Sequence, residues 1–307
     1  MIVISFEKNI LLGGLGDRIV GLISCKVISN LLNKPFYISW NKENVKEYID
    51  YRDYDYELIK HTKHVSSIKY YSYIDNQLGL KHYLMNESNI FMDDVNIFHL
   101  NQEISQYLYK NPRFNNYNYY EDILNEYRNL YTTILKPTAL LKNKIDSLII
   151  INENIIGIQI RTGDKNMVTN QGEQHSIFTN NIDNDILNIL ERIKIHCEEG
   201  LYKEYKIFLT SDYNNIYNIA LNVWEANNII YNNDLIQHLD RNAVNGDISK
   251  VFVDSYILAQ NTNALYISTW SNYGRIAALT ANHDNIYDLF CIKLNKKHLV
   301  SKHEIIS

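Results

Sequence analysis

Apolar residues recur with a helical period near the amino terminus of the chain. Short β-prone runs precede the periodic segment at residues 3–6 and 9–12, and another run follows it at residues 36–40, after Asn33-Lys34-Pro35. This pattern predicts a βαβ unit whose glycine-rich loop, residues 13–16, leads into the helix. The residues that form one face of that helix are Ile19, Val20, Leu22, Ile23, Val27, Ile28, Leu31 and Leu32.

From about residue 151 the pattern alternates regularly between strands and helices. We expect Asp183 to be the N-cap of the first of these helices and Asp247 to cap the third. Strands that alternate with helices indicate a parallel, doubly wound sheet, which binds ligands at the carboxyl ends of its strands. The predicted strands are residues 155–160, 205–210, 229–231 and 264–268, and the predicted helices are 183–196, 214–225, 247–260 and 272–281.

Residues 41–150 lack this regularity, and we interpret them as irregular α/β structure with long loops. Their last segment, residues 138–148 after Pro137, predicts a helix with proline near its first turn. A length of 307 residues suggests about two domains. We therefore expect an α/β protein with two Rossmann-like, doubly wound domains, at residues 1–150 and 151–307.

Composition adds mainly exclusions. Hydrophobic residues make up 46% of the chain, which suits globular cores, and the net charge of −5 gives no sign of nucleic-acid binding. The sequence contains neither an apolar run of about 18 residues nor a basic and apolar leader. We expect no membrane span and a cytoplasmic location. The abundance of Tyr, Asn, Ile and Lys suits an AT-rich genome, such as that of a large virus, a protist or a low-GC bacterium. The cysteines, which show no metal-binding or disulfide spacing and are expected to stay reduced, are Cys25, Cys197 and Cys291.

The loop Gly13-Gly14-Leu15-Gly16-Asp17-Arg18 lies between a predicted strand and a predicted helix. Bare backbone N–H groups at Gly14 and Gly16 can approach a phosphate, helped by the positive end of the helix dipole. The loop has no Gly-Lys-Ser/Thr of a Walker loop, and Ile19 stands where a dinucleotide fingerprint has its third glycine. A tight strand-to-helix turn explains the loop equally well.

Polar residues also follow three strands of the second half. Arg161 ends the strand at 155–160, and its planar guanidinium suits the oxygens of a leaving pyrophosphate, although an ion pair with Asp164 is the alternative. Asp212 suits the N–H groups of guanine or ribose hydroxyls, unless it caps the helix that follows. Ser271 and Asn272 begin a helix whose N–H groups form an anion site, although capping alone explains Ser271. Together these strand ends indicate a site for a nucleoside diphosphate.

At these residues the chain resembles the GDP-fucose-dependent fucosyltransferases of the GT-B fold. This group includes the nodulation and N-glycan-core α1,6-, the xyloglucan and the protein O-fucosyltransferases. The resemblance rests on GIQIRTGDK at residues 157–165 and STWSNYGR at residues 268–275, and it covers residues 14–40 and most of 154–282. It implies two domains that face a donor cleft, and inverting transfer of fucose from GDP-fucose to a hydroxyl of a glycan or protein acceptor.

The resemblance also implies roles for individual residues. Arg161 would bind the β-phosphate and be essential, and the general base would be Asp164, Glu173 or Asp17. Since Arg161 and the helix that begins at Asn272 would stabilise the leaving group, no metal or cofactor is expected. The implied donor-binding residues are Gln159 and Asp212 for the base, Ser271 and Asn272 for the phosphates, Lys165 for the loop or sugar, Gly14 and Gly16 for the pyrophosphate, and in addition Asp17, Arg18 and Arg275.

Other interpretations stay open at this point. Asp53-Tyr54-Asp55 and Asp183-Asn184-Asp185 are Asp-x-Asp strings like those that hold manganese in another transferase fold, but neither follows an apolar strand. The same fold could use another GDP-sugar or a UDP-sugar. It could also serve as a non-catalytic module that binds a glycan or a protein.

Overall fold

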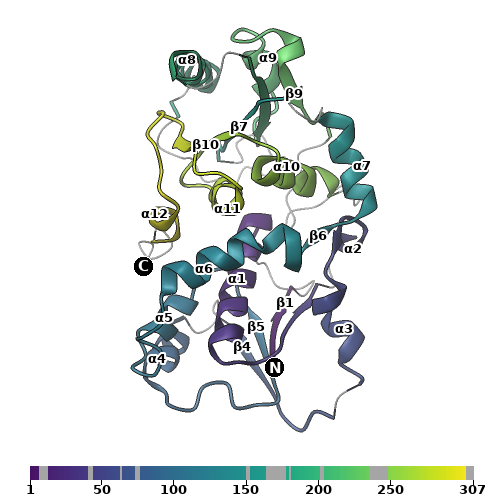
Figure 1. Cartoon of the computed structure of the whole chain (residues 1–307), viewed down its shortest axis with the longest axis vertical. Helices are drawn as coiled ribbons and strands as arrows, with labels where there is room; N and C mark the ends of the chain where they lie inside the picture. The colour runs from purple at the N-terminus through teal and green to yellow at the C-terminus, as the bar shows by residue number, and fades with distance from the viewer. Residues whose placement is uncertain are drawn as a thin grey trace. The chain divides into compact units, whose positions relative to one another are not determined.

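The computed structural model describes residues 1–6, 13–40, 44–62, 64–72, 77–149, 153–163, 178–179, 181–200, 204–234 and 248–301. Contacts divide the chain into two compact units, one built on Met1–Ala139 and the other on Leu140–Gln237 and Ser249–Leu299. Each unit contains its own parallel sheet (Figure 1). The division falls within helix α7 (Ala139–Leu148), whereas the boundary predicted from the sequence lies after that helix.

The first unit has a four-stranded sheet in which every pair of neighbours is parallel. The two central strands, β1 and β5, are buried at every position, as expected for strands that are covered on both faces. A short antiparallel pair, β3 (Ile49–Asp50) with β6 (Lys136–Pro137), lies outside this sheet. The strands, in sheet order, are β2 (Phe36–Ser39), β1 (Ile2–Ser5), β5 (Val95–His99) and β4 (Ile68–Ser72).

Helix α1 (Leu15–Leu31) packs on β1 and beside α6 in the first unit (Figure 1). A Cβ atom at Gly21 would lie 2.1 Å from the carbonyl oxygen of Leu100, so only glycine lets the helix approach the chain after β5 this closely. The helix begins three residues before the predicted start, which places Gly16 in its first turn. The other helical segments are α2 (Val45–Tyr48), the 3₁₀ turn η1 (Arg52–Tyr54), α3 (Tyr56–Ile59), α4 (Gln77–Asn86), α5 (Ser105–Tyr109), α6 (Tyr119–Arg128) and the π-helical turn η2 (Leu130–Ile134).

The second unit has a five-stranded parallel sheet with the strand order of a doubly wound fold. The chain builds one half of the sheet from β7 outward and then returns to the other side of β7. The order of the strands therefore reverses between β7 and β10, the position where such sheets bind ligands. The strands, in sheet order, are β11 (Ile286–Asp288), β10 (Ala264–Ile267), β7 (Ile155–Ile160), β8 (Lys206–Ser211) and β9 (Ile229–Tyr231).

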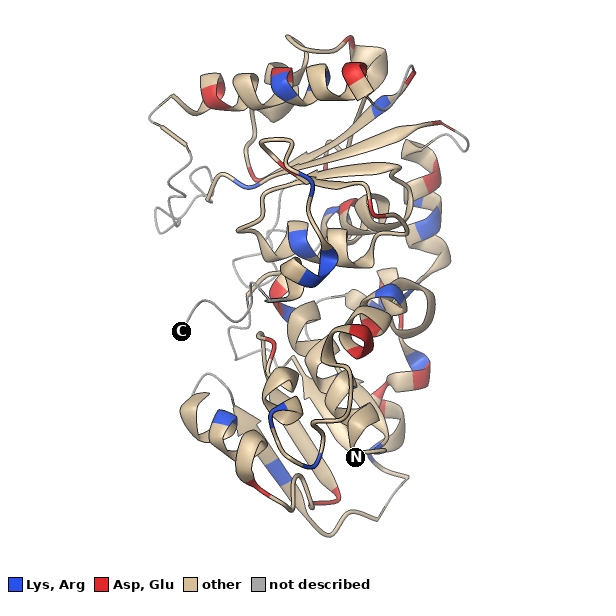
Figure 2. Ribbon diagram, turned by 60° about the vertical axis from the view of Figure 1, so that its left-hand side comes forward, with Lys and Arg blue, Asp and Glu red and all other residues tan. Residues whose placement is uncertain are grey.

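Helices cover both faces of this second sheet. The side chains of Ile156, Ile158 and Ile160 lie in one apolar core with α8 and α9, above the sheet in Figure 1, whereas α10 and α11 lie below it. Charged residues of both signs follow one another along α8, at the top of Figure 2. The helical segments are α7, α8 (Ile182–Gly200), α9 (Ile216–Ala220), the 3₁₀ turn η3 (Ala226–Asn228), α10 (Ser249–Gln260), α11 (Asn272–Thr280) and α12 (Lys296–Ser301).

Two local predictions about α8 and α9 are wrong. Asn181 caps α8, because its side-chain oxygen accepts a hydrogen bond from the N–H of Asn184 at 3.3 Å. Asp183 lies inside the helix and accepts hydrogen bonds from Tyr213 and Asn215. Helix α9 ends at Ala220 instead of residue 225. The N–H groups of Asn222 and Val223 donate to carbonyls three residues earlier, which is the tighter hydrogen-bond pattern of a 3₁₀ turn. Asp247, the other predicted cap, lies outside the described residues.

Glu103 generates a testable prediction about stability. Burial raises the pKa of its carboxyl group from 4.5 to about 7, although Ser105 and Gln106 donate hydrogen bonds to it. The folded protein therefore holds a proton that the unfolded chain has lost, and stability should decrease by about 3 kcal/mol as the pH rises from about 4.5 to about 7. Urea denaturation at several pH values should show this decrease in the wild type and a flatter profile in Glu103→Gln.

The exposed Glu121 in α6 offers the control for this measurement. Glu121→Gln should keep the wild-type dependence on pH, because an exposed carboxylate changes its solvation little on folding. An unchanged slope between pH 4.5 and 7 in Glu103→Gln would contradict the prediction.

Candidate functional site

Arg161 and Ser268 meet where the strand order of the second sheet reverses. Gln159 of β7 pairs with Ile267 of β10, so both strands end at the same edge of the sheet. The backbone N–H of Arg161 donates to Oγ of Ser268 at 2.8 Å, and Nε1 of Trp270 donates to the carbonyl of Arg161 at 3.2 Å. These two hydrogen bonds join the loop after β7 to the loop after β10.

Asp212, the residue after β8, fixes the same loop from the other side. One carboxylate oxygen accepts the N–H of Thr162 at 2.7 Å and its hydroxyl at 3.0 Å, and the other oxygen accepts the N–H of Gly163 at 3.0 Å. The second oxygen also lies 3.5 Å from Nε of Arg161. The carboxylate of Asp212 is buried, so its hydrogen-bonding capacity serves the loop at residues 161–163.

The guanidinium of Arg161 is the accessible part of this arrangement. Its side chain is 28% exposed, while the partner Asp212 is almost fully buried. A guanidinium presents five N–H donors in a planar fork, and contact with Asp212 through Nε orients this fork. The structure thus supplies a positioned cation at the edge of the sheet where parallel α/β proteins bind ligands.

Gln159 lies beneath helix α11. Its side chain is buried, and its oxygen accepts a hydrogen bond from the N–H of Ser268 at 3.3 Å. A Cβ atom at Gly274 would lie 2.3 Å from that oxygen, so the glycine allows α11 to pack directly on Gln159. Gln159 therefore supports the end of β10 and the start of α11.

The amino terminus of α11 begins beside this strand end. Ser271 is the N-cap, and its hydroxyl accepts the N–H of Gly274 at 3.4 Å. Asn272 is the first residue of the helix, and its side-chain oxygen accepts a hydrogen bond from Arg275, which is buried. Capping and anion binding are compatible here, because a helix start has several N–H groups that its own turns do not use.

In the first unit, Asp17 and Arg18 hold the glycine loop in place. Gly13 has a φ of +79°, and Gly14 donates its N–H to the carboxylate of Asp17 at 3.0 Å. Arg18 is only 1% exposed, and its Nε donates to the carbonyl of Gly13 at 3.3 Å. Its guanidinium carbon also lies 5.8 Å from the ring centre of Trp40. Both charged side chains therefore support the loop from within the fold.

Three predicted site residues, Asp164, Lys165 and Glu173, lie outside the described residues. The carboxylates of Asp53 and Asp55, from one Asp-x-Asp string, each form an ion pair with a lysine. Within the described ranges, no group of three or more His, Cys, Asp or Glu side chains is arranged to hold a metal ion. The described helices also include none that is both long and apolar enough to cross a bilayer.

A buried polar cluster behind β8 and β9 was missed in the sequence. Asp254 of α10 accepts hydrogen bonds from Thr210 at 2.8 Å and Asn232 at 3.0 Å, and Nζ of Lys250 lies 3.2 Å from it. Burial raises the pKa of Asp254, and the nearby ammonium group of Lys250 opposes this shift. The signal in the sequence is a Lys and an Asp four residues apart on a helix that is otherwise largely apolar.

The hydrogen bonds of Asp212 lead to a prediction about stability. Asp212→Asn replaces one acceptor oxygen by an NH₂ group that faces N–H donors, so buried donors lose their partner. We expect a loss of about 1–3 kcal/mol in the free energy of unfolding, measured by urea denaturation. The control is Asp234→Asn, because Asp234 in the same unit is half-exposed and its carboxylate lies 3.4 Å from the hydroxyl of Ser249 and 3.9 Å from Nζ of Lys144. Equal stability of the two variants would contradict the assignment.

Comparisons with known proteins give their result at the level of the fold. No protein-family model matches the sequence, and no curated protein matches it either. Among solved structures, a mutant of Arabidopsis thaliana FUT1 in complex with GDP is similar, with a TM-score of 0.56 and 12% identity over 94% of this chain and 69% of that chain.

NodZ α-1,6-fucosyltransferase soaked with GDP-fucose is similar to the same degree, with a TM-score of 0.56 and 12% identity over 91% of this chain and 92% of that chain. A further structure, of fucosyltransferase NodZ from Bradyrhizobium, has a TM-score of 0.55 and 14% identity over the same shares of the two chains, 91% and 92%. The predicted α/β fold of the GT-B fucosyltransferases is therefore confirmed for this chain.

Proposed function

We propose that this chain is a glycosyltransferase that transfers fucose from GDP-fucose to a hydroxyl group of a glycan or glycoprotein. The observation that carries this proposal is the loop after β7, which Asp212 and Ser268 fix while the guanidinium of Arg161 stays accessible. The fold shared with fucosyltransferases solved with GDP or GDP-fucose supports the same conclusion.

The diphosphate of the donor is proposed to bind at the shared end of β7 and β10. Arg161 would donate to the β-phosphate in the bidentate geometry that suits a guanidinium, and the positive end of helix α11, which begins at Ser271 and Asn272, would attract the phosphate oxygens. In this proposal Asp212 acts through the loop as a positioning residue, and Gln159 and Arg275 act by supporting α11.

The proposed reaction is a direct displacement with inversion at the anomeric carbon. The acceptor oxygen forms a bond to that carbon as the bond to the β-phosphate oxygen of GDP breaks, and the hydroxyl proton passes to a general base. Arg161 and the helix terminus would neutralise the charge that develops on the leaving diphosphate, so the proposal includes no metal. The candidates for the base are Asp164, Glu173 and Asp17, and Lys165 would order the loop or contact the sugar.

Arg161→Ala tests the proposal at its central residue. The variant should lower kcat for fucosyl transfer by about 10²–10³-fold, because it removes a charge positioned for the transition state. It should also weaken GDP binding at least about tenfold, measured by calorimetry, because it removes charge-assisted hydrogen bonds. Its melting temperature should change little, since the guanidinium is not fully buried.

Arg192→Ala is the matched control, because Arg192 is an exposed arginine of the same unit that lies over Phe290. This variant should keep wild-type transfer and GDP affinity. Full activity of Arg161→Ala would refute the assignment of the site. Thermal stabilisation of the wild type by UDP but not by GDP would redirect the proposal to a UDP-sugar, and absence of nucleotide binding would favour a non-catalytic module.

A further inference from the structure

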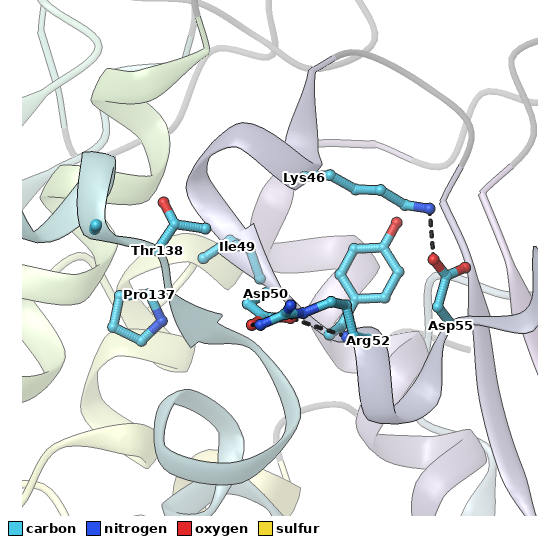
Figure 3. Close-up of a pocket in the computed structure, with 9 residues that line it drawn as sticks. Lys46, Ile49, Asp50, Arg52, Asp55, Pro137 and Thr138 are labelled. Atoms are coloured by element: carbon cyan, nitrogen blue, oxygen red, sulfur yellow. Dashed lines mark hydrogen bonds and ion pairs between the residues drawn. The ribbon is translucent and has the colours of Figure 1, made fainter. Parts of the chain in front are cut away.

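The first unit contains a cavity of about 490 Å³ that the proposed transfer reaction does not use. It opens between helix α2, the strand pair β3–β6 and the chain that leads into α3. Figure 3 shows Lys46 and Asp55 at one end of the cavity, Pro137 and Thr138 at the other, and Asp50 with Arg52 between them. A volume of this size falls within the range of about 300–1,000 Å³ that is usual for small-molecule sites.

Two ion pairs line the cavity. Nζ of Lys46 lies 2.5 Å from a carboxylate oxygen of Asp55, and Nη2 of Arg52 lies 2.7 Å from a carboxylate oxygen of Asp50. Nε of Arg52 contacts both oxygens of Asp50, at 3.0 Å and 3.1 Å, so this pair is held in a fixed geometry. The hydrogen bonds from Arg52 lower the pKa of Asp50, so its carboxylate stays ionised at neutral pH.

The cations of these pairs extend towards solvent, while one of the anions does not. The side chain of Arg52 is 81% exposed and that of Lys46 is 52% exposed, whereas Asp55 is buried. The remaining N–H donors of Arg52 and Lys46 are therefore accessible to a molecule in the cavity, and the carboxylate of Asp50 offers acceptor positions beside them. The four charges of the two pairs sum to zero.

Between the ion pairs the walls are apolar and rigid. Ile49, Pro137 and Ala139 contribute carbon surface, and Tyr51 contributes part of an aromatic ring whose hydroxyl donates to the carbonyl of Trp40 at 3.2 Å. Proline has a fixed backbone and the tyrosine is buried, so these walls lose little conformational freedom when a ligand binds.

A neutral sugar matches this combination of groups. Its hydroxyls both donate and accept hydrogen bonds, as fixed ion pairs require, and the C–H groups of its ring can pack on the apolar walls. An anion would lie beside the carboxylate of Asp50, and a cation would lie beside Lys46 and Arg52, so either kind of charged ligand would meet a like charge.

We propose that this cavity binds a neutral sugar residue of the acceptor glycan, as a subsite distinct from the Arg161 loop. This inference rests on the proposed function in one respect, namely that the bound sugar belongs to the acceptor of the transfer reaction. The preference for a neutral sugar follows from the two ion pairs and the apolar walls, and does not depend on that function. The cavity would thus help to select acceptors by a sugar that does not react.

The test uses the full chain and measures binding of neutral, acidic and amine-bearing oligosaccharides by saturation-transfer NMR and calorimetry. The wild type should bind neutral oligosaccharides of hexose and N-acetylhexosamine and prefer them to sialylated or amino-sugar analogues. Arg52→Ala should weaken this binding at least about tenfold. Arg128→Ala, which alters an exposed arginine–carboxylate pair on α6 of the same unit, should leave it unchanged.

GDP affinity, measured on the same samples, separates this proposal from the proposed function. It should be equal in the wild type and Arg52→Ala, and Arg161→Ala should lose GDP binding while it retains the oligosaccharide. Oligosaccharide binding that survives in Arg52→Ala, or a preference for charged analogues, would overturn the cavity assignment. If Arg52→Ala does not fold, hydrogen exchange of the wild type decides: the oligosaccharide should protect residues 46–55 and 136–139 but not 121–128.

Discussion

The geometry of the candidate site depends on one buried carboxylate. Asp212 reaches from the end of β8 to the loop after β7 and accepts two backbone N–H groups and one hydroxyl there. Without such an acceptor those donors would be buried and unsatisfied, because the strand has ended and no sheet partner remains. The same carboxylate contacts the guanidinium of Arg161, so backbone conformation and side-chain direction are fixed together.

The order of strands gives this interaction its place in the fold. β7 is the central strand of the second sheet, so its carboxyl end has β8 on one side and β10 on the other. Asp212 approaches from the first side and Ser268 from the second. In the first unit, Asp17 and Arg18 hold the glycine loop in a comparable way, with a carboxylate on an N–H group and a guanidinium on a carbonyl. In both units, charged residues that were predicted from the sequence to contact the ligand also fix the backbone of the neighbouring loop.

Much of the second unit could be predicted from its sequence. The strand at 155–160 has the predicted bounds. Fully buried parallel strands are nearly continuous apolar runs, and such a run is easy to recognise in a sequence. β11 was not predicted, although β9 of the same length was, and β4 and β5 were not predicted in the less regular first half of the chain. The partners of Asp212 were not predictable, because they depend on the register of β7 against β8 and not on spacing along the chain. The prediction of Asp183 as N-cap was wrong because asparagine and aspartate cap helices equally well, so residue type alone does not distinguish Asn181 from Asp183.

The position of β5 in the first sheet has a consequence for synthesis of the chain. β5 lies between β1 and β4, yet it is the last of the four strands in the sequence. A nascent chain that ends before residue 99 therefore has two separated sheet fragments with unpaired inner edges, which invite association with other chains. In the second sheet β7, β8 and β9 can pair in sequence order, but the other edge of β7 stays unpaired until β10 is made, about a hundred residues later. In each unit an inner edge of the sheet thus stays unpaired until late in translation, and protection of that edge by chaperones would matter most during that interval.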